Sequence, residues 1–242
     1  MHENLGEQLT IEDMAKTAMF SKFHFSRVFQ RATGLSPGRF LSAIRLQEAK
    51  RLLASTSLSV TEISHRVGYA SVGTFSSRFR SSVGFSPTMY RRIGGFTGKT
   101  CPEPRLRVLS QPRATISGRV RPSSTGRPGM IFIGLFPDRL PHGQPVRCTA
   151  LEQPGLFTLD DVPAGRWHVL VYSPAESVEK DEDLFIPAQR TSGGDLNGFV
   201  GSHGPVTIRP DTGVSFADVR LRSMTPMDPP VLLALLDERA TG

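Results

Sequence analysis

The chain has 242 residues, which is long enough for two modest domains, each with its own core. Its net charge of +7 is uneven: residues 1–100 hold 14 Lys and Arg against 6 Asp and Glu, whereas residues 101–242 hold 15 against 16. Residues 1–4 show no signal-peptide pattern, no apolar run is long enough for a membrane span, and there are only two cysteines. The sequence therefore predicts a soluble, cytoplasmic protein with reduced thiols, no metal and no cofactor.

Two short helices are predicted at the start of the chain. Residues 11–17 have the apolar spacing of a supporting helix, and Ser21 is a suitable N-cap for a second helix over residues 21–32. Phe25 and Phe29 are one turn apart and are expected to face inward together with Val28. The outer face then offers donors for guanine or phosphate and an aromatic edge for a thymine methyl group. Its residues are Lys22, Phe23, Ser26, Arg27 and Gln30.

A longer helix is predicted over residues 36–55, because apolar residues recur there at helical spacing. The stripe consists of Leu41, Ile44, Leu46, Ala49, Leu52 and Leu53.

About fifty residues after the first unit the same pattern returns. Residues 75–79 repeat residues 25–29, and the Gly-Phe-Ser-Pro of residues 84–87 repeats the Gly-Leu-Ser-Pro of residues 34–37. With Ser71 as N-cap, the outer face of the second unit has small side chains, and arginines nearby can bind phosphate. The candidates are Val72, Gly73, Thr74, Ser76 and Ser77 for the outer face, with Arg78, Arg80, Arg91 and Arg92 for phosphate.

The chain changes character after residue 95. Glycine and proline crowd residues 94–104, which predicts a linker over residues 96–111. Residues 112–224 then alternate apolar and polar side chains in short runs, which predicts an antiparallel sandwich of about seven strands. The predicted strands are residues 114–121, 130–136, 145–151, 156–159, 166–172, 206–209 and 214–222. Residues 173–202 form a long loop, and the tail over residues 225–242 includes a short helix with Asp228 as its N-cap.

The repeated motif resembles the double helix-turn-helix of the AraC/XylS family of transcription regulators. The second copy carries Gly68-Tyr69, Ser71 and Ser86-Pro87 of the family signature, and the first carries Ala15, Ser21 and Ser36-Pro37. The resemblance covers residues 3–95 and implies seven helices, two of which read DNA bases. It places base-reading residues at Phe23, Ser26, Arg27, Val72, Gly73, Thr74, Ser76 and Ser77.

Two features depart from the family pattern. Many members place an effector or dimerisation domain before the DNA-binding unit, whereas here the DNA-binding unit precedes the β-rich half. The second recognition helix also lacks the long polar side chains that the family often has there, which predicts weaker base discrimination by this unit.

The β-rich half resembles the carboxypeptidase-regulatory-like, or transthyretin-like, sandwich through the Val-Pro-Ala-Gly turn at residues 162–165 and Trp167-His168. Such domains are usually accessory modules. His168 is interpreted as a solvent-facing strand histidine rather than a ligand. Cys148 lies in a predicted strand without the Pro-Cys-His context of a family alkyl-transfer domain, so no catalytic residue and no enzyme is predicted.

The sequence thus predicts a sequence-specific regulator of transcription that binds double-stranded DNA through residues 1–95. The β-rich half would sense an effector, dock a partner or dimerise, and RNA polymerase and a small-molecule or protein effector are left open as partners. The alternative is that the sandwich is the functional centre and a weakly specific basic domain merely tethers it to DNA.

Overall fold

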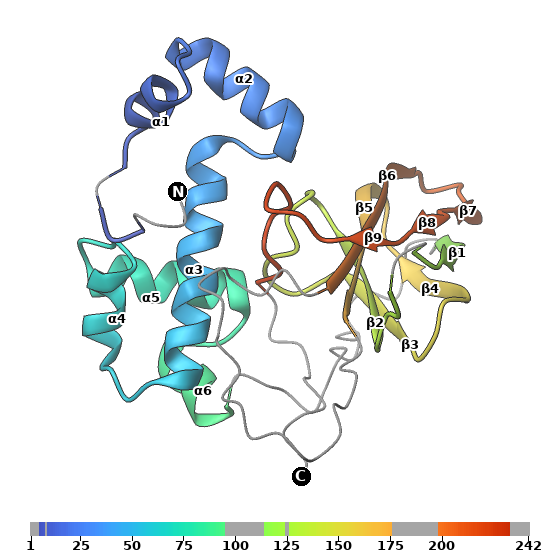
Figure 1. The fold of residues 1–242 in the computed structure, drawn as a ribbon. Coiled ribbons are helices and arrows are strands. Elements are labelled where there is room, and N and C mark those ends of the chain that lie inside the picture. The colour runs from blue at the N-terminus through green and yellow to red at the C-terminus, as the bar shows by residue number, and fades with distance from the viewer. Residues whose placement is uncertain (1–4, 8, 95–113, 124–125, 176–197, 233–242) are drawn as a thin grey trace.

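The computed structural model describes residues 5–7, 9–94, 114–123, 126–175 and 198–232. The described chain forms a helical half and a β-rich half that lie side by side (Figure 1). The predicted linker over residues 96–111 and most of the predicted loop over residues 173–202 lie outside these ranges. The ends of that loop belong to two strands instead.

The helical half has six helices among the described residues, where the resemblance implies about seven. Residues 5–7 form a turn, and Thr10 has the extended backbone of an N-cap, so no helix precedes Ile11 in the described chain. The helices are α1 (Ile11–Thr17), α2 (Lys22–Thr33), α3 (Pro37–Ser55), α4 (Val60–Arg66), α5 (Val72–Val83) and α6 (Pro87–Arg92). Their bounds confirm the predicted arrangement of two helix pairs joined by one long helix.

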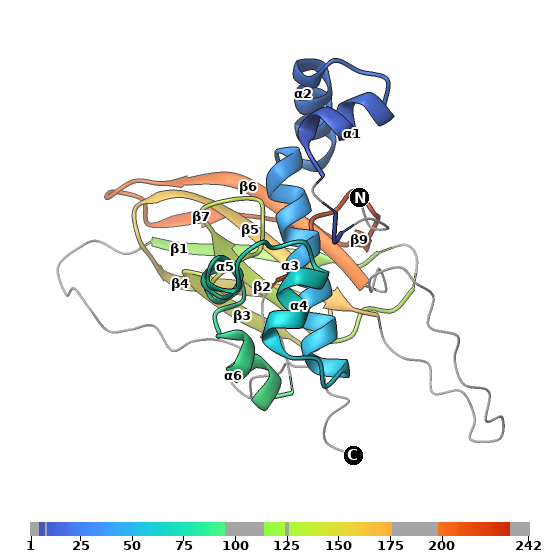
Figure 2. The same cartoon turned by 90° about the vertical axis from the view of Figure 1, so that its left-hand side faces the viewer.

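The long helix α3 organises the helical half because it belongs to two apolar cores. Leu41 packs with Met14, Ala15 and Phe25 in a small core under the first helix pair. The remaining residues of the predicted stripe are buried in a larger core with α4, α5 and α6. All six stripe residues are buried, as predicted. Figures 1 and 2 show α3 standing upright, with α1 and α2 at its upper end.

The β-rich half consists of two sheets that share one apolar core. One sheet has the order β4-β1-β7, with β8 also paired to β1, and the other has the order β3-β2-β5-β6-β9. Ile116 and Phe157 of the first sheet meet Ile133 and Val171 of the second in this core. The strands are β1 (Ala114–Arg121), β2 (Ile131–Phe136), β3 (Arg147–Leu151), β4 (Leu156–Val162), β5 (Gly165–Pro174), β6 (Gly198–Ile208), β7 (Val214–Phe216), β8 (Val219–Arg220) and β9 (Arg222–Ser223).

Most of the predicted strands are confirmed, but the last one is wrong. Residues 214–222 form three short strands rather than one, because the chain crosses from the first sheet to the second over this stretch. The strands β7 and β8 run parallel to β1, whereas β9 pairs antiparallel with β6. The sandwich is therefore mostly, but not wholly, antiparallel.

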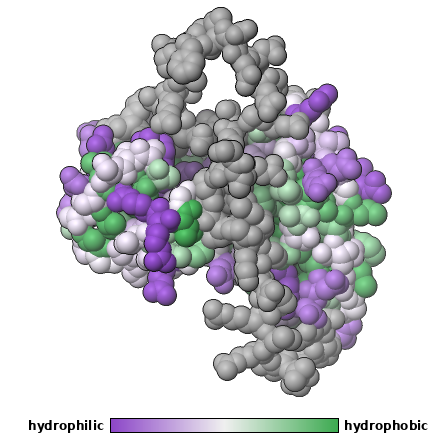
Figure 3. All heavy atoms as spheres, turned by 90° about the horizontal axis from the view of Figure 1, so that it is seen from below, coloured by the Kyte–Doolittle hydropathy of each residue, from purple (hydrophilic) through white to green (hydrophobic). Residues whose placement is uncertain are grey.

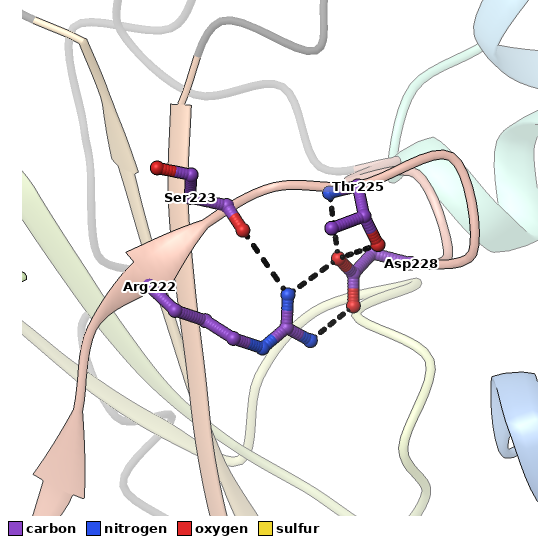
Figure 4. A network of polar contacts seen from close by, with 4 residues as sticks. All are labelled: Arg222, Ser223, Thr225 and Asp228. Atoms are coloured by element: carbon purple, nitrogen blue, oxygen red, sulfur yellow. Dashed lines mark hydrogen bonds and ion pairs between the residues drawn. The ribbon is translucent and has the colours of Figure 1, made fainter. Parts of the chain in front are cut away.

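Two further expectations fail in this half. The tail is not helical over residues 229–232, and the Asp228 carboxylate accepts hydrogen bonds from Arg222 and Thr225 instead of capping a helix (Figure 4). The remainder of that predicted helix lies outside the described residues. Cys148 is disulfide-bonded, so the expectation of reduced thiols is wrong for this residue.

Candidate nucleic-acid interface

The two helix pairs repeat each other in their capping as well as in their sequence. In the first, the Asp13 backbone N–H donates to Thr10 Oγ1 at 3.2 Å and the Thr10 N–H donates to Asp13 Oδ2 at 2.9 Å. In the second, Ser59 and Glu62 form the same reciprocal pair at 3.2 and 2.7 Å. Hydrogen bonds from the side chain and the backbone N–H of Thr10 lower the pKa of the Asp13 carboxyl group, and those from Ser59 do the same for Glu62. Each supporting helix therefore begins at a fixed residue.

A ladder of aromatic rings holds each recognition helix to the helix that follows it. In the first unit Phe25, Phe29 and Phe40 contact one another in turn, the first pair tilted and the second edge to face, with ring centroids 5.5 and 5.3 Å apart. In the second unit Phe75 and Phe79 lie 5.6 Å apart, and Phe79 and Tyr90 lie 5.5 Å apart. Because these rings fill the inner face, the opposite face of each recognition helix remains toward solvent.

The recognition helices also start and stop alike. Ser21 and Ser71 are the N-caps, each accepting a hydrogen bond from a backbone N–H three residues later at 3.3 and 3.4 Å. Gly34 and Gly84 end the helices with left-handed backbone, φ 78° and 95°. Such a C-terminal glycine reverses the chain without the clash that a Cβ atom would cause.

The structure places most of the predicted readers of α2 on its outer face. Lys22, Arg27 and Gln30 are exposed, and Phe23 is 86% exposed although its side chain is large and apolar. Ser26 is half-buried on the flank. Val28 is 36% exposed, so its predicted inward position is wrong, because the helical turn carries it away from Phe25 and Phe29.

Sequence reasoning missed His24, which is exposed in the first turn of α2 and contacts the Phe20 ring in a tilted arrangement at a centroid distance of 4.8 Å. The repeat contains the signal that would have found it. The fifty-residue spacing matches His24 with Thr74, which was selected as a reader in the second unit.

Lys22 has a partner within the protein. Its ammonium group forms an ion pair with Glu12 of α1, and both side chains are about half exposed or more. The Lys22 hydrogen bond lowers the pKa of the Glu12 carboxyl group. A phosphate contact by Lys22 would therefore compete with this surface pair, which is weak and screened by salt.

The outer face of α5 carries smaller side chains in the same places. Gly73, Thr74 and Ser77 are exposed, while Val72 and Ser76 are half-buried on the flanks. The fifty-residue spacing matches Ser77 with Arg27. The second unit thus offers one hydroxyl group where the first offers a guanidinium group.

The four arginines predicted as phosphate ligands differ in their exposure and in their hydrogen bonds within the protein. Arg78, Arg80 and Arg92 are exposed. Arg91 is half-buried, and its guanidinium donates to the carbonyl oxygens of Leu53 at 3.2 Å and Leu58 at 2.5 Å. Arg91 therefore ties α6 to the end of α3, which leaves it fewer donors for DNA than the other three have.

The described residues contain no cluster of three or more His, Cys, Asp or Glu side chains that could hold a metal ion. Among the described helices none has the length and apolarity needed to cross a membrane. His168 is half-buried on β5, not solvent-facing as predicted, and burial lowers the pKa of its imidazole.

Comparisons with known proteins match residues of the helical half. Residues 14–93 match a family model described as a helix-turn-helix domain. An uncharacterised HTH-type transcriptional regulator of Haemophilus influenzae is 43% identical over 82 residues, which are 34% of this chain and 28% of that protein. The HTH-type transcriptional activator AarP of Providencia stuartii is 33% identical over 88 residues, 36% of this chain and 65% of AarP.

Among solved structures, the DNA-binding domain of AdpA in complex with a target DNA is 36% identical. The match covers 38% of this chain and 83% of that one, with a TM-score of 0.37. An AraC-type regulator from Chromobacterium violaceum is 30% identical over 39% of this chain and 84% of its own, with a TM-score of 0.38. The chain spans between 28% and 65% of the length of the first curated relatives, and these matches cover about its first two fifths.

Proposed function

We propose that this chain, in which residues 14–93 form an AraC-type helix-turn-helix domain, is a sequence-specific regulator of transcription that binds double-stranded DNA. The observation that supports this most is the internal repeat. Two units with the same caps, the same ring ladder and the same glycine stops each present one recognition helix with an exposed outer face. The excess positive charge of the first hundred residues fits a polyanionic partner.

The two recognition helices would enter successive segments of the major groove on one side of the duplex, about 34 Å apart. One chain could then read two segments without dimerising. The sandwich lies beside the C-terminal ends of α2 and α5, since Gly143 donates to the Ser82 carbonyl at 2.6 Å and Arg139 packs on Gly34. The N-terminal turns, which carry Phe23 and Gly73, point away from the sandwich (Figure 1) and remain accessible to DNA.

Footprinting of the full chain on the DNA upstream of its own gene tests this proposal. We expect protection of about two helical turns, with affinity that falls when the site is scrambled. Equal affinity for scrambled DNA would show that the protein binds DNA through its positive charge without sequence specificity. The salt dependence should be steep in either case and does not separate the two outcomes.

The second candidate function places the activity in the sandwich, as an interaction or ligand-sensing module that the helical half merely holds on DNA. The contact between the halves favours a sandwich that acts on the helical half, because Leu140 and Leu232 are buried in the helical core. RNA polymerase, a protein effector and a second copy of the chain remain candidate partners of the sandwich. Its likeness to the carboxypeptidase-regulatory-like fold also remains a proposal.

Truncation after Gly98 separates these candidates. Unchanged DNA binding with lost regulation would favour a sensing or docking sandwich, whereas lost DNA binding would favour a sandwich that dimerises or supports the helical half. Because truncation also removes Leu140 and Leu232, the stability of the truncated chain must be measured alongside its affinity.

A further inference from the structure

The outer face of the five-stranded sheet is covered over β2. Every residue of β2 is buried, whereas the other long strands alternate. Ile131, Ile133 and Leu135 fill the sandwich core. Phe132 and Phe136 lie on the opposite face, where an isolated sandwich would meet water, yet they are only 9% and 2% exposed.

The helical half and the segment after β9 form the cover of this face. Arg39 of α3 pairs with Asp138 at 2.6 Å. Lys50 of α3 donates to the Val231 carbonyl at 3.0 Å. Leu140, two residues after Asp138, and Leu232, directly after Val231, are both buried in the helical core. The two halves are therefore joined by apolar burial, an ion pair and backbone hydrogen bonds together.

The cover is incomplete and leaves a cavity of about 570 Å³ between the halves. The floor includes Phe132, Phe136 and Leu170 of the sheet, and the opposite wall is made by the C-terminal ends of α2 and α5. The segment over residues 227–231 closes one side. A volume of this size is in the range that holds a small organic ligand, and the aromatic floor suits an apolar one.

The charged groups of the cavity are nearly all cationic. Four arginines line it, and Asp228 is the one carboxylate among the described lining residues. Asp228 is already bound by Arg222, in the network that Figure 4 shows. Arg31, Arg139 and Arg220 form no ion pair with any other residue that the structure describes. The wall therefore has uncompensated positive charge next to an apolar floor.

We propose that this cavity binds a small organic carboxylate with an apolar body. The carboxylate would accept charge-assisted hydrogen bonds from Arg139 or Arg220, while the body would lie on Phe132 and Leu170. A neutral apolar molecule would leave the guanidinium groups without a partner, and an inorganic anion would leave the floor empty. Both parts of the ligand are thus required by the cavity.

The ligand would touch both helix-turn-helix units, because residues 31–34 and 83–85 line the same cavity. The role of this carboxylate as the effector of a regulator rests on the function proposed above. Its binding to the cavity does not rest on that function, because binding is measurable in the absence of DNA. Failure of the footprint and failure of the cavity proposal are therefore separate results.

The test uses the full chain, the fluorescent anion 1-anilinonaphthalene-8-sulfonate as a reporter and octanoate as the competing ligand. We expect one reporter molecule per chain, displaced by octanoate but not by the neutral 1-octanol at the same concentration. Arg139→Gln or Arg220→Gln, whichever removes the guanidinium group that holds the carboxylate, should weaken octanoate binding about tenfold, the value of one lost charge-assisted hydrogen bond. Arg209→Gln, at a sandwich arginine outside the cavity lining, is the matched control and should change nothing.

A blocking variant guards against reporter binding elsewhere on the surface. Leu170→Trp places an indole in the cavity and should abolish the octanoate-sensitive signal, while circular dichroism checks that the variant is folded. Three results would overturn the proposal: no displacement by octanoate, equal displacement by octanoate and 1-octanol, or an unchanged octanoate affinity in both arginine variants.

Discussion

Met19 and Gly68 occupy matching positions in the turns of the two helix-turn-helix units, and both have left-handed backbone, with φ of 56° and 84°. This conformation suits glycine but strains a residue with a Cβ atom. Met19 is 91% exposed, so its side chain contributes little packing. We expect Met19→Gly to raise the free energy of unfolding by about 0.5–1 kcal/mol, measured by urea denaturation.

Gly68→Ala is the matched control for this variant and should act in the opposite direction. An added Cβ atom at Gly68 would lie 2.3 Å from the Leu5 carbonyl oxygen, so the backbone would have to move. A Met19→Gly chain that is no more stable than the parent would show that the turn carries no strain.

Arg27 tests base reading at a single residue. We expect Arg27→Ala to cost about 1–3 kcal/mol on the specific site and to relax the preference at one base pair. Arg92→Ala should weaken binding to all sequences alike, as a phosphate contact does. Affinities on a panel of single-base variants distinguish the two patterns. An equal loss on every sequence for Arg27→Ala would reassign Arg27 to the phosphate backbone.

At the scale of the helices, the contrast between α2 and α5 predicts unequal half-sites. The exposed side chains Arg27 and Gln30 of α2 can make paired hydrogen bonds to a base, whereas Gly73 and Ser77 of α5 cannot. Base substitutions under α2 should cost about 1–3 kcal/mol each, and those under α5 less. Larger penalties under α5 would show that backbone approach at Gly73 matters more than side-chain type.

The short helix α6 gives the helical half a dependence on alkaline pH. Burial raises the pKa of Tyr90 to about 12, so the folded state favours the neutral phenol. The stabilisation is complete below pH 10, the ordinary pKa of the group, and is lost as the pH rises toward 12. Between pH 8 and pH 11 the free energy of unfolding should fall by about 1 kcal/mol more in the parent chain than in Tyr90→Phe. An identical pH dependence of the free energy of unfolding in both chains would contradict the raised pKa of Tyr90.

Helix ends and strands that are determined by residues close together in the sequence were predictable. Serine caps, Gly-Leu-Ser-Pro and Gly-Phe-Ser-Pro fix the helix ends, and residue alternation fixes most strands. Features that depend on contacts with residues far away in the sequence were not predictable. Asp228 was expected to cap a helix but pairs with Arg222. The predicted strand over residues 214–222 is divided because its parts pair with strands of two different sheets. At the candidate site, Arg91 was predicted as a phosphate ligand, but its guanidinium donates to the carbonyl oxygens of Leu53 in α3 and of Leu58 just after it.

At the scale of the whole molecule, the two halves share buried side chains. Seen from below, hydrophilic side chains lie on both the helical half and the sandwich (Figure 3). Leu140 belongs to the β-rich half of the sequence but is buried in the helical core. The stability of the helical half is therefore coupled to the position of the sandwich.

Leu140→Ala tests this coupling. The lost contacts should lower the stability of the helical half by about 2–4 kcal/mol. The single tryptophan, Trp167 of β5, reports on the sandwich by fluorescence, and circular dichroism at the helical minimum reports on the helices. We expect the helical signal to be lost at lower urea while the Trp167 signal changes less. Leu156→Ala, at a sandwich leucine that is 69% exposed, is the control and should alter neither.

The burial of Leu232 in the helical core has a consequence for the order of synthesis. The helices leave the ribosome first, but a leucine that their core encloses is translated only after both sheets, a delay on the order of ten seconds. During that interval the nascent helical half holds an unfilled site in its interior. Full stability of the helical half thus waits until residue 232 has left the ribosome, so a chain that ends prematurely within the sandwich has an unfinished helical core.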